Sequence, residues 1–168
     1  MKKKNVGLTR KKADQILSRL ITTADECYFE NKCEVPYYAS RIIVFGSYMT
    51  DKEKLGDLDV FIEKKSKWKC RREMVDFFLN HPNNKERTII NKLAFADNVF
   101  YRFLKEGSTS LSMHDISEMD AFLQENPQFK YEEIYNVKSI TEEEGALIPE
   151  WLKEQQLETL ETSEMQQA

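Results

Sequence analysis

The chain has few of the residues that build tight turns, with five Gly and four Pro among its 168 residues. This composition disfavours β-sandwiches and barrels, whose many short strands need frequent turns. Its apolar runs are also short, and the segment at residues 41–45 is one of the longest, whereas a membrane-spanning helix needs about 20 apolar residues. The sequence therefore excludes collagen-like and transmembrane classes and predicts no membrane partner.

Cysteine is scarce as well, with three residues and no Cys-x-x-Cys spacing. An odd number of cysteines without paired spacing indicates neither a disulfide framework nor a zinc site. The basic start, residues 1–12, lacks the apolar stretch and the small-residue cleavage site of a secretory signal. These features predict a cytoplasmic location.

Apolar residues nonetheless make up 40% of the chain and charged residues 32%, as in folded globular domains. The charge is segregated along the sequence. Residues 1–12 contain six Lys or Arg and no acid, whereas residues 137–168 contain eight Glu and two Lys. We therefore expect one domain over residues 1–136 and an acidic, partly helical or disordered tail over residues 137–168.

Hydrophobic periodicity predicts an α+β (α/β-like) fold, in which helices pack on a small mixed β-sheet and an acidic helical tail follows. The expected strands cover residues 40–46, 57–62 and 109–113. The expected helices cover residues 9–31, 85–106 and 115–126, and another starts at Pro149. One more helix follows the basic stretch 64–72 and buries Val75, Phe78 and Leu79. The buried stripe of the helix at 85–106 includes Ile89, Leu93 and Phe100. Asp115 and Glu118 have the spacing of a capping box, as do Thr141 and Glu144.

Most of the functional information lies between the first two expected strands. Gly46-Ser47 follows a buried strand, and a turn of this kind offers backbone and hydroxyl donors to phosphates. After a spacer of nine residues, Asp57 and Asp59 stand two apart on a strand, so that both carboxylates project from one face. Two such carboxylates can hold Mg²⁺ that is bridged to substrate phosphates. The alternative for the aspartates is a turn followed by a half-exposed strand. For Ser47 it is an ordinary helix N-cap.

This arrangement resembles the core motif of the DNA polymerase β-like nucleotidyltransferase superfamily, and in particular its minimal nucleotidyltransferases. The resemblance implies a nucleotidyltransferase fold and transfer of a nucleoside monophosphate to a hydroxyl, either AMP from ATP or the corresponding group from another nucleoside triphosphate. It implies that Asp57 and Asp59 are catalytic and hold Mg²⁺, and that Gly46 and Ser47 bind the nucleotide phosphates. It also implies a protein, RNA or small-molecule acceptor. In small members the acceptor can be a partner toxin, with the transferase acting as antitoxin.

The superfamily often has a third carboxylate on a later strand, and Asp115 is the candidate here. Asp115 has two interpretations: a catalytic carboxylate, or the first residue of the capping box with Glu118. His114 likewise has two interpretations, a base or a residue of the surface or core. A chain without a third carboxylate would be an inactive scaffold that binds a partner or a nucleotide.

The basic residues at 1–12 and 64–72 leave open a third class of function, nucleic-acid binding. The alternative for residues 64–72 is a solvated helix start. The acidic tail contains Trp151, Leu157 and Leu160, which would suit either docking to a partner or covering the basic body.

Overall fold

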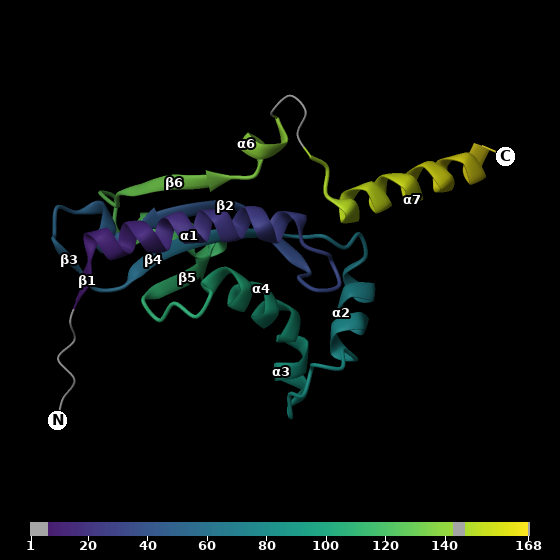
Figure 1. The fold of residues 1–168 in the computed structure, drawn as a ribbon, viewed down its shortest axis with the longest axis horizontal. Helices are drawn as coiled ribbons and strands as arrows, with labels where there is room; N and C mark the ends of the chain where they lie inside the picture. Colours follow the sequence, from purple (N-terminus) through teal and green to yellow (C-terminus); the bar gives the residue numbers. More distant parts are fainter. Residues whose placement is uncertain (1–6, 143–146, 168) are drawn as a thin grey trace.

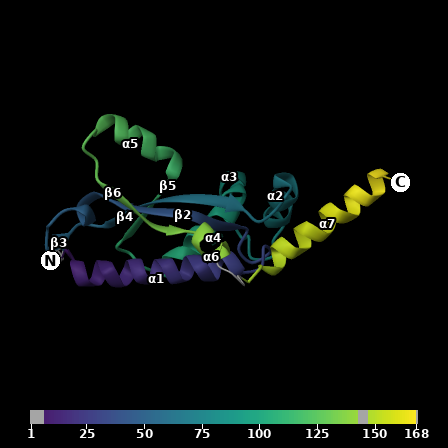
Figure 2. The same ribbon diagram turned by 90° about the horizontal axis from the view of Figure 1, so that it is seen from above.

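The computed structural model describes residues 7–142 and 147–167, with side chains described up to residue 162. A four-stranded mixed sheet has the order β5-β4-β2-β6 and lies between helices on both faces (Figures 1 and 2). Its strands are β2 (Tyr37–Phe45), β4 (Leu58–Ser66), β5 (Leu111–Asp115) and β6 (Tyr131–Asn136). β2 pairs antiparallel with β4 and β6, whereas β4 and β5 are parallel. The predicted α+β class with a small mixed sheet is confirmed.

The helices are α1 (Arg10–Phe29), α2 (Arg71–Leu79), α3 (Ile89–Leu93), α4 (Phe95–Lys105), α5 (Met119–Glu125), α6 (Lys138–Thr141) and α7 (Glu150–Gln167). The 3₁₀ turns η1 (Gly46–Met49) and η2 (Ile116–Glu118) follow β2 and β5 directly. Short strands β1 (Leu8–Thr9) and β3 (Lys54–Leu55) pair beside the main sheet. Thr9 caps α1 by accepting a hydrogen bond from the backbone N–H of Lys12, which explains why the helix predicted for residues 9–31 forms there.

The main core lies between the sheet and helices α1 and α4. Leu58, Val60 and Ile62 of β4 face this side together with Leu20 and Phe100. On the opposite face, Ile43, Phe45 and Phe61 pack against residues of η2, α5 and the loop after α5. Figure 2 shows α5 on one side of the sheet and α1 on the other. The strand predicted at residues 40–46 is thus buried on both faces, as expected.

The predicted long helix at residues 85–106 is wrong in its first half. The chain forms α3 and α4 instead, with a break at Ala94. Thr88 caps α3 through its hydroxyl, which accepts from the N–H of Asn91, so the helix begins later than residue 85. Ile89 and Leu93, expected on the buried stripe, are 62% and 50% exposed, because α3 lies at the end of the molecule (Figure 1).

Three other boundaries differ from the sequence-based prediction. β4 extends to Ser66 because its polar end pairs with Tyr37–Ala39. β5 begins two residues later than expected and runs on to Asp115. α6 ends at Thr141, where a helix was expected to begin; the proposed partner Glu144 lies outside the described residues.

β6 was not predicted at all. Its sequence, Tyr131–Asn136, contains two glutamates, and acidic residues are depleted in strands. It forms because β2 offers a free edge, and Arg41 on β2 holds Glu133 of β6 at 2.6 Å.

The segment after residue 136 contacts the rest of the fold at several places. Val137 and Ile140 pack against the main core. Trp151, at the start of α7, is only 5% exposed and packs against Tyr28 and Tyr38. Farther along α7, Glu154, Gln155 and Glu158 contact Lys32, Lys67 and Lys69. The rest of α7 extends away from the body (Figures 1 and 2). The acidic tail is therefore helical, as expected, and its first turn contributes to the buried interior.

The three cysteines are free thiols. Within residues 7–142 and 147–167, no helix is both long and apolar enough to cross a bilayer.

Candidate functional site

Gly46 occupies the junction between β2 and η1 with a φ of +73°. This left-handed conformation is strained for residues with a side chain. A β-carbon at this position would also lie 3.0 Å from Oδ2 of Asp59. The pairing of Phe45 with Asp59 across β2 and β4 produces this close approach. Glycine at position 46 therefore satisfies two requirements, the backbone turn and the space for a carboxylate.

The two aspartates stand at the start of β4. Asp57 is exposed just before the strand, and Asp59 is half-buried within it. Burial raises the pKa of the Asp59 carboxyl, and the charge of Asp57 acts in the same direction, while His114 opposes both. The hydroxyl of Ser47 donates to the backbone carbonyl of Asp57 at 3.4 Å. The structure thus brings together Gly46, Ser47, Asp57 and Asp59.

His114 lies on the same face of the sheet as Asp59. Ser112 is the register partner of Asp59 across the parallel β4–β5 pair, and His114 follows two residues later. Its Nε2 is 3.6 Å from Oδ1 of Asp59, and its Nδ1 is 3.6 Å from Oε2 of Glu118. The imidazole therefore stands between two carboxylates, and its ring also contacts Phe45 at a centroid distance of 5.5 Å.

Asp115 is placed differently. Its register partner in β4 is Ile62, which faces the main core, so the two residues lie on the face opposite Asp59. The predicted capping box is confirmed: Asp115 Oδ1 accepts from the N–H of Ser117, and Glu118 accepts from the N–H of Asp115. Hydrogen bonds from the hydroxyl and the N–H of Ser117 lower the pKa of the Asp115 carboxyl. The structure does not bring this carboxylate beside Asp57 and Asp59.

Sequence reasoning singled out Glu118 as a capping residue only, and it did not single out Ser112. The signal for Glu118 was its spacing of four from His114, which puts the two in contact across the turn into η2. Within the described part of the chain, no three His, Cys, Asp or Glu side chains form a metal-binding group. Mg²⁺ that is bound with a nucleotide does not need such a cage, because one or two carboxylates plus substrate phosphates suffice. Asp57 and Asp59 are oxygen donors of the kind Mg²⁺ prefers, so the residues present fit that ion.

Cavities border Asp57 and Gly46. One of about 640 Å³ is lined by Asp57, Ser112 and residues of α4. Another of about 600 Å³ is lined by Asp57 and Lys12. A third of about 380 Å³ contains Gly46 and the loop around Phe129.

Three cations of the basic segment 64–72 are engaged by other parts of the protein, whereas Lys65, Arg71 and Arg72 are exposed. Lys64 forms an ion pair with Asp97. Lys67 is fully buried and donates to two carbonyls near the C-terminal end of α1, at 2.5 and 2.9 Å. Lys69 pairs with a glutamate of α7 at 3.5 Å. These contacts favour a structural role for Lys64, Lys67 and Lys69 over nucleic-acid binding.

Comparison with known proteins gives no significant match, whether to a family model, to a curated protein or to a solved structure. Any functional inference therefore rests on the residues and geometry of this chain.

Proposed function

We propose that this protein is a Mg²⁺-dependent nucleotidyltransferase that transfers a nucleoside monophosphate, from ATP or another nucleoside triphosphate, to a hydroxyl of a protein, RNA or small molecule. The observation that carries the proposal is the close approach of the Asp59 carboxylate to Gly46, where a β-carbon would lie 3.0 Å from Oδ2. It joins the turn suited to phosphates to the strand that bears Asp57 and Asp59. In the superfamily that the motif resembles, these elements form the catalytic centre.

The proposed roles follow from position. Gly46 and Ser47 bind the triphosphate through backbone N–H groups and the hydroxyl. Asp57 and Asp59 hold Mg²⁺, which neutralises charge on the transferred phosphoryl group and on the leaving pyrophosphate. His114, 3.6 Å from Asp59, orients that carboxylate.

The reaction exchanges one bond for another at the α-phosphorus. The acceptor oxygen bonds to this atom, the bond to the oxygen that bridges to the β-phosphorus breaks, and pyrophosphate leaves. The hydroxyl proton passes to water. Catalysis of this kind depends mainly on positioning and charge neutralisation.

The test is incubation with α-labelled ATP, Mg²⁺ and candidate acceptors. Wild-type protein should label an acceptor and release pyrophosphate, and Asp59→Asn should lower the rate at least about 100-fold. Asp76→Asn is the matched control, because Asp76 is an exposed aspartate of α2 outside the cavities that border Asp57 and Gly46. Equal labelling by wild type and by Asp57→Asn/Asp59→Asn would refute the catalytic role.

A second candidate, a nucleotide-binding scaffold without catalysis, is favoured by one observation. Asp115, the candidate third carboxylate, caps η2 and lies on the other face of the sheet from Asp59. A scaffold would show a thermal shift with Mg²⁺ and ATP but would release no pyrophosphate with any acceptor. The two measurements together separate the candidates.

A further inference from the structure

The cavity of about 640 Å³ beside Asp57 has a cationic side that the proposed Mg²⁺ and triphosphate site does not use. It lies between α4 and the outer edge strand β5. Its polar and charged lining residues are Asp57, Asn98, Tyr101, Arg102, Lys105, Thr109 and Ser112. Asp57 is the one acid among these lining residues, so two cations and several donors face a single carboxylate.

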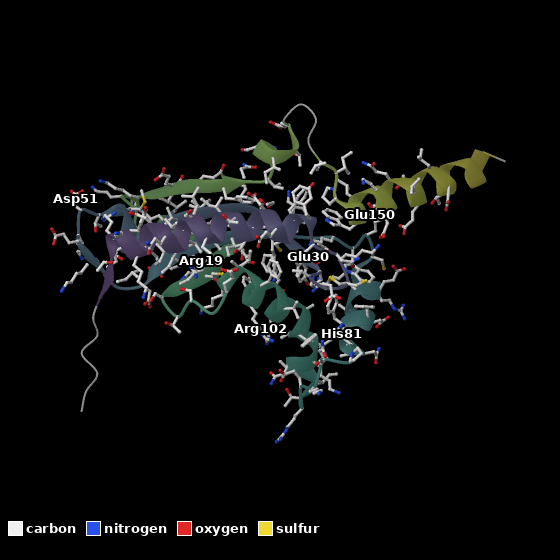
Figure 3. The ribbon with its side chains drawn as sticks, viewed as in Figure 1. Arg19, Glu30, Asp51, His81, Arg102 and Glu150 are labelled. Atoms are coloured by element: carbon white, nitrogen blue, oxygen red, sulfur yellow. The ribbon has the colours of Figure 1, made fainter. Side chains whose placement is uncertain are left out.

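Arg102 and Lys105 stand three residues apart near the end of α4, so both project toward one side of the helix. Among the described residues, neither cation forms an ion pair, in contrast to Lys64 and Lys69. Arg102 is exposed and Lys105 is half-buried. Figure 3 shows Arg102 on α4 and Arg19 on α1.

The positive charge continues beyond this cavity. A neighbouring cavity of about 260 Å³ shares Lys105 and Thr109 and adds Lys12 and Arg19 of α1, together with Glu106, which forms an ion pair with Arg19 at 3.5 Å. A third, of about 600 Å³, connects Lys12 back to Asp57 and again includes Thr109. Lys12 of α1 and Lys105 of α4 therefore lie around the loop at residues 107–110, with the Arg19–Glu106 ion pair and Asp57 beside them.

Guanidinium and ammonium groups that face a cavity beside hydroxyl and amide donors suit a phosphate, which accepts several charge-assisted hydrogen bonds. In an in-line displacement, the attacking and leaving oxygens lie on opposite sides of the phosphorus. Gly46, on the proposed leaving-group side, lines a different cavity from Arg102 and Lys105. The cationic cavity is thus separate from the proposed triphosphate turn, yet it borders Asp57, where the acceptor would have to reach the proposed Mg²⁺ site.

We propose that the cavity between Asp57 and α4 binds a phosphate group of the acceptor, held by Arg102 and Lys105, so that the acceptor is a phosphorylated hydroxyl compound. The role as acceptor site rests on the proposed nucleotidyl transfer. The phosphate site itself does not, because its geometry involves neither a nucleotide nor Mg²⁺.

Binding is measured on the full chain by NMR titration in low-salt buffer with EDTA and without nucleotide, using ribose 5-phosphate, ribose and a single-stranded ten-nucleotide oligomer as probes. Ribose 5-phosphate should shift resonances of α4 and residues 107–112, whereas ribose should not. Arg102→Gln and Lys105→Gln should each weaken binding about tenfold. Asp57→Asn should strengthen it, because a like charge is removed.

Arg72→Gln and Lys153→Gln are the matched controls, since both side chains are exposed cations outside the cavity. Arg102 is exposed, so its variant keeps the test valid even where Lys105→Gln affects folding. Tighter binding of the oligomer identifies a polynucleotide phosphate, and tighter binding of ribose 5-phosphate identifies a small phosphorylated sugar; each supports the site. Unchanged binding in Arg102→Gln and Lys105→Gln would overturn it. Failure of the labelling reaction with any acceptor would count against nucleotidyl transfer and leave the phosphate measurement standing.

Discussion

Oδ2 of Asp59 lies so close to Gly46 that a β-carbon at residue 46 would come within 3.0 Å of it. The two residues belong to strands that pair antiparallel, and this pairing brings the turn after β2 and the carboxylate of β4 to one place. Glycine in the left-handed conformation leaves the carboxylate free to take a cation and the backbone free to approach a phosphate.

Gly46→Ala should therefore affect both stability and nucleotide binding. The left-handed backbone costs a residue with a side chain about 1–2 kcal/mol, and the new methyl group displaces Asp59. Chemical denaturation and Mg²⁺–ATP binding by calorimetry measure the two effects. Gly107→Ala is the control, because Gly107 also has a φ of +73° but nothing lies within 4 Å of its position for a β-carbon. Equal nucleotide binding in the two variants would contradict the importance of the Gly46–Asp59 contact.

Asp115→Ala separates capping from catalysis. Loss of the N-cap should lower the free energy of unfolding by about 1 kcal/mol, whereas the labelling rate should stay the same, because the carboxylate faces away from Asp59. Asp120→Ala, an exposed aspartate in the first turn of α5, should leave stability nearly unchanged. A large loss of labelling with unchanged stability would show that Asp115 is a catalytic carboxylate and not only a helix cap.

Trp151 should be the main attachment of α7. Its indole N–H donates to the carbonyl of Tyr28 at 2.7 Å, and its ring stacks on Tyr38 at 5.4 Å. Trp151→Ala should destabilise the protein by about 3–5 kcal/mol. Leu157→Ala, at a side chain that is 61% exposed, should change stability by less than about 0.5 kcal/mol. Equal unfolding midpoints in urea for wild type and Trp151→Ala would show that α7 is dispensable for the fold.

Lys67 should make stability depend on pH in the alkaline range. Burial lowers the pKa of its ammonium to about 8, whereas an unfolded lysine titrates near pH 10.4. Between these values the unfolded chain binds more protons than the folded one, so this residue's contribution to the unfolding free energy rises with pH, by up to about 1.4 kcal/mol per unit.

The measurement compares wild type with Lys67→Met at pH 7.5 and pH 9.5, because the difference isolates Lys67 from other groups. One such group is Cys27, whose thiol pKa burial raises to about 11, which acts in the opposite direction. Wild type should gain stability relative to the variant as the pH rises. A constant difference would mean that Lys67 titrates normally in the folded protein.

Much of the local structure could be predicted because its causes lie within a few residues. The Thr9 cap and the apolar stripe specify α1, the β-branched run specifies β2, and Asp115 with Glu118 specifies the turn after β5. The Gly46-Ser47 turn and the spacing of the aspartates were likewise visible in the sequence.

Other features depend on partners far along the chain. β6 has a polar sequence and forms because β2 has an edge to pair with. Lys67 and Lys69 looked like a solvated basic surface, but Lys67 is fully buried beneath the end of α1. No short-range pattern contains this information, because the hydrogen-bond partners are supplied by tertiary packing.

The sequence by itself therefore determined the α+β class and the chemistry of the candidate site: a glycine turn, a serine hydroxyl and two carboxylates at a fixed spacing. Only the tertiary structure decided that His114, and not Asp115, stands beside Asp59. The physical reason is strand alternation: once β4 and β5 pair in parallel with Asp59 beside Ser112, successive side chains point to alternate faces of the sheet. His114, two residues after Ser112, therefore shares the face of Asp59, whereas Asp115 lies on the other face. That register arises from packing over the whole sheet.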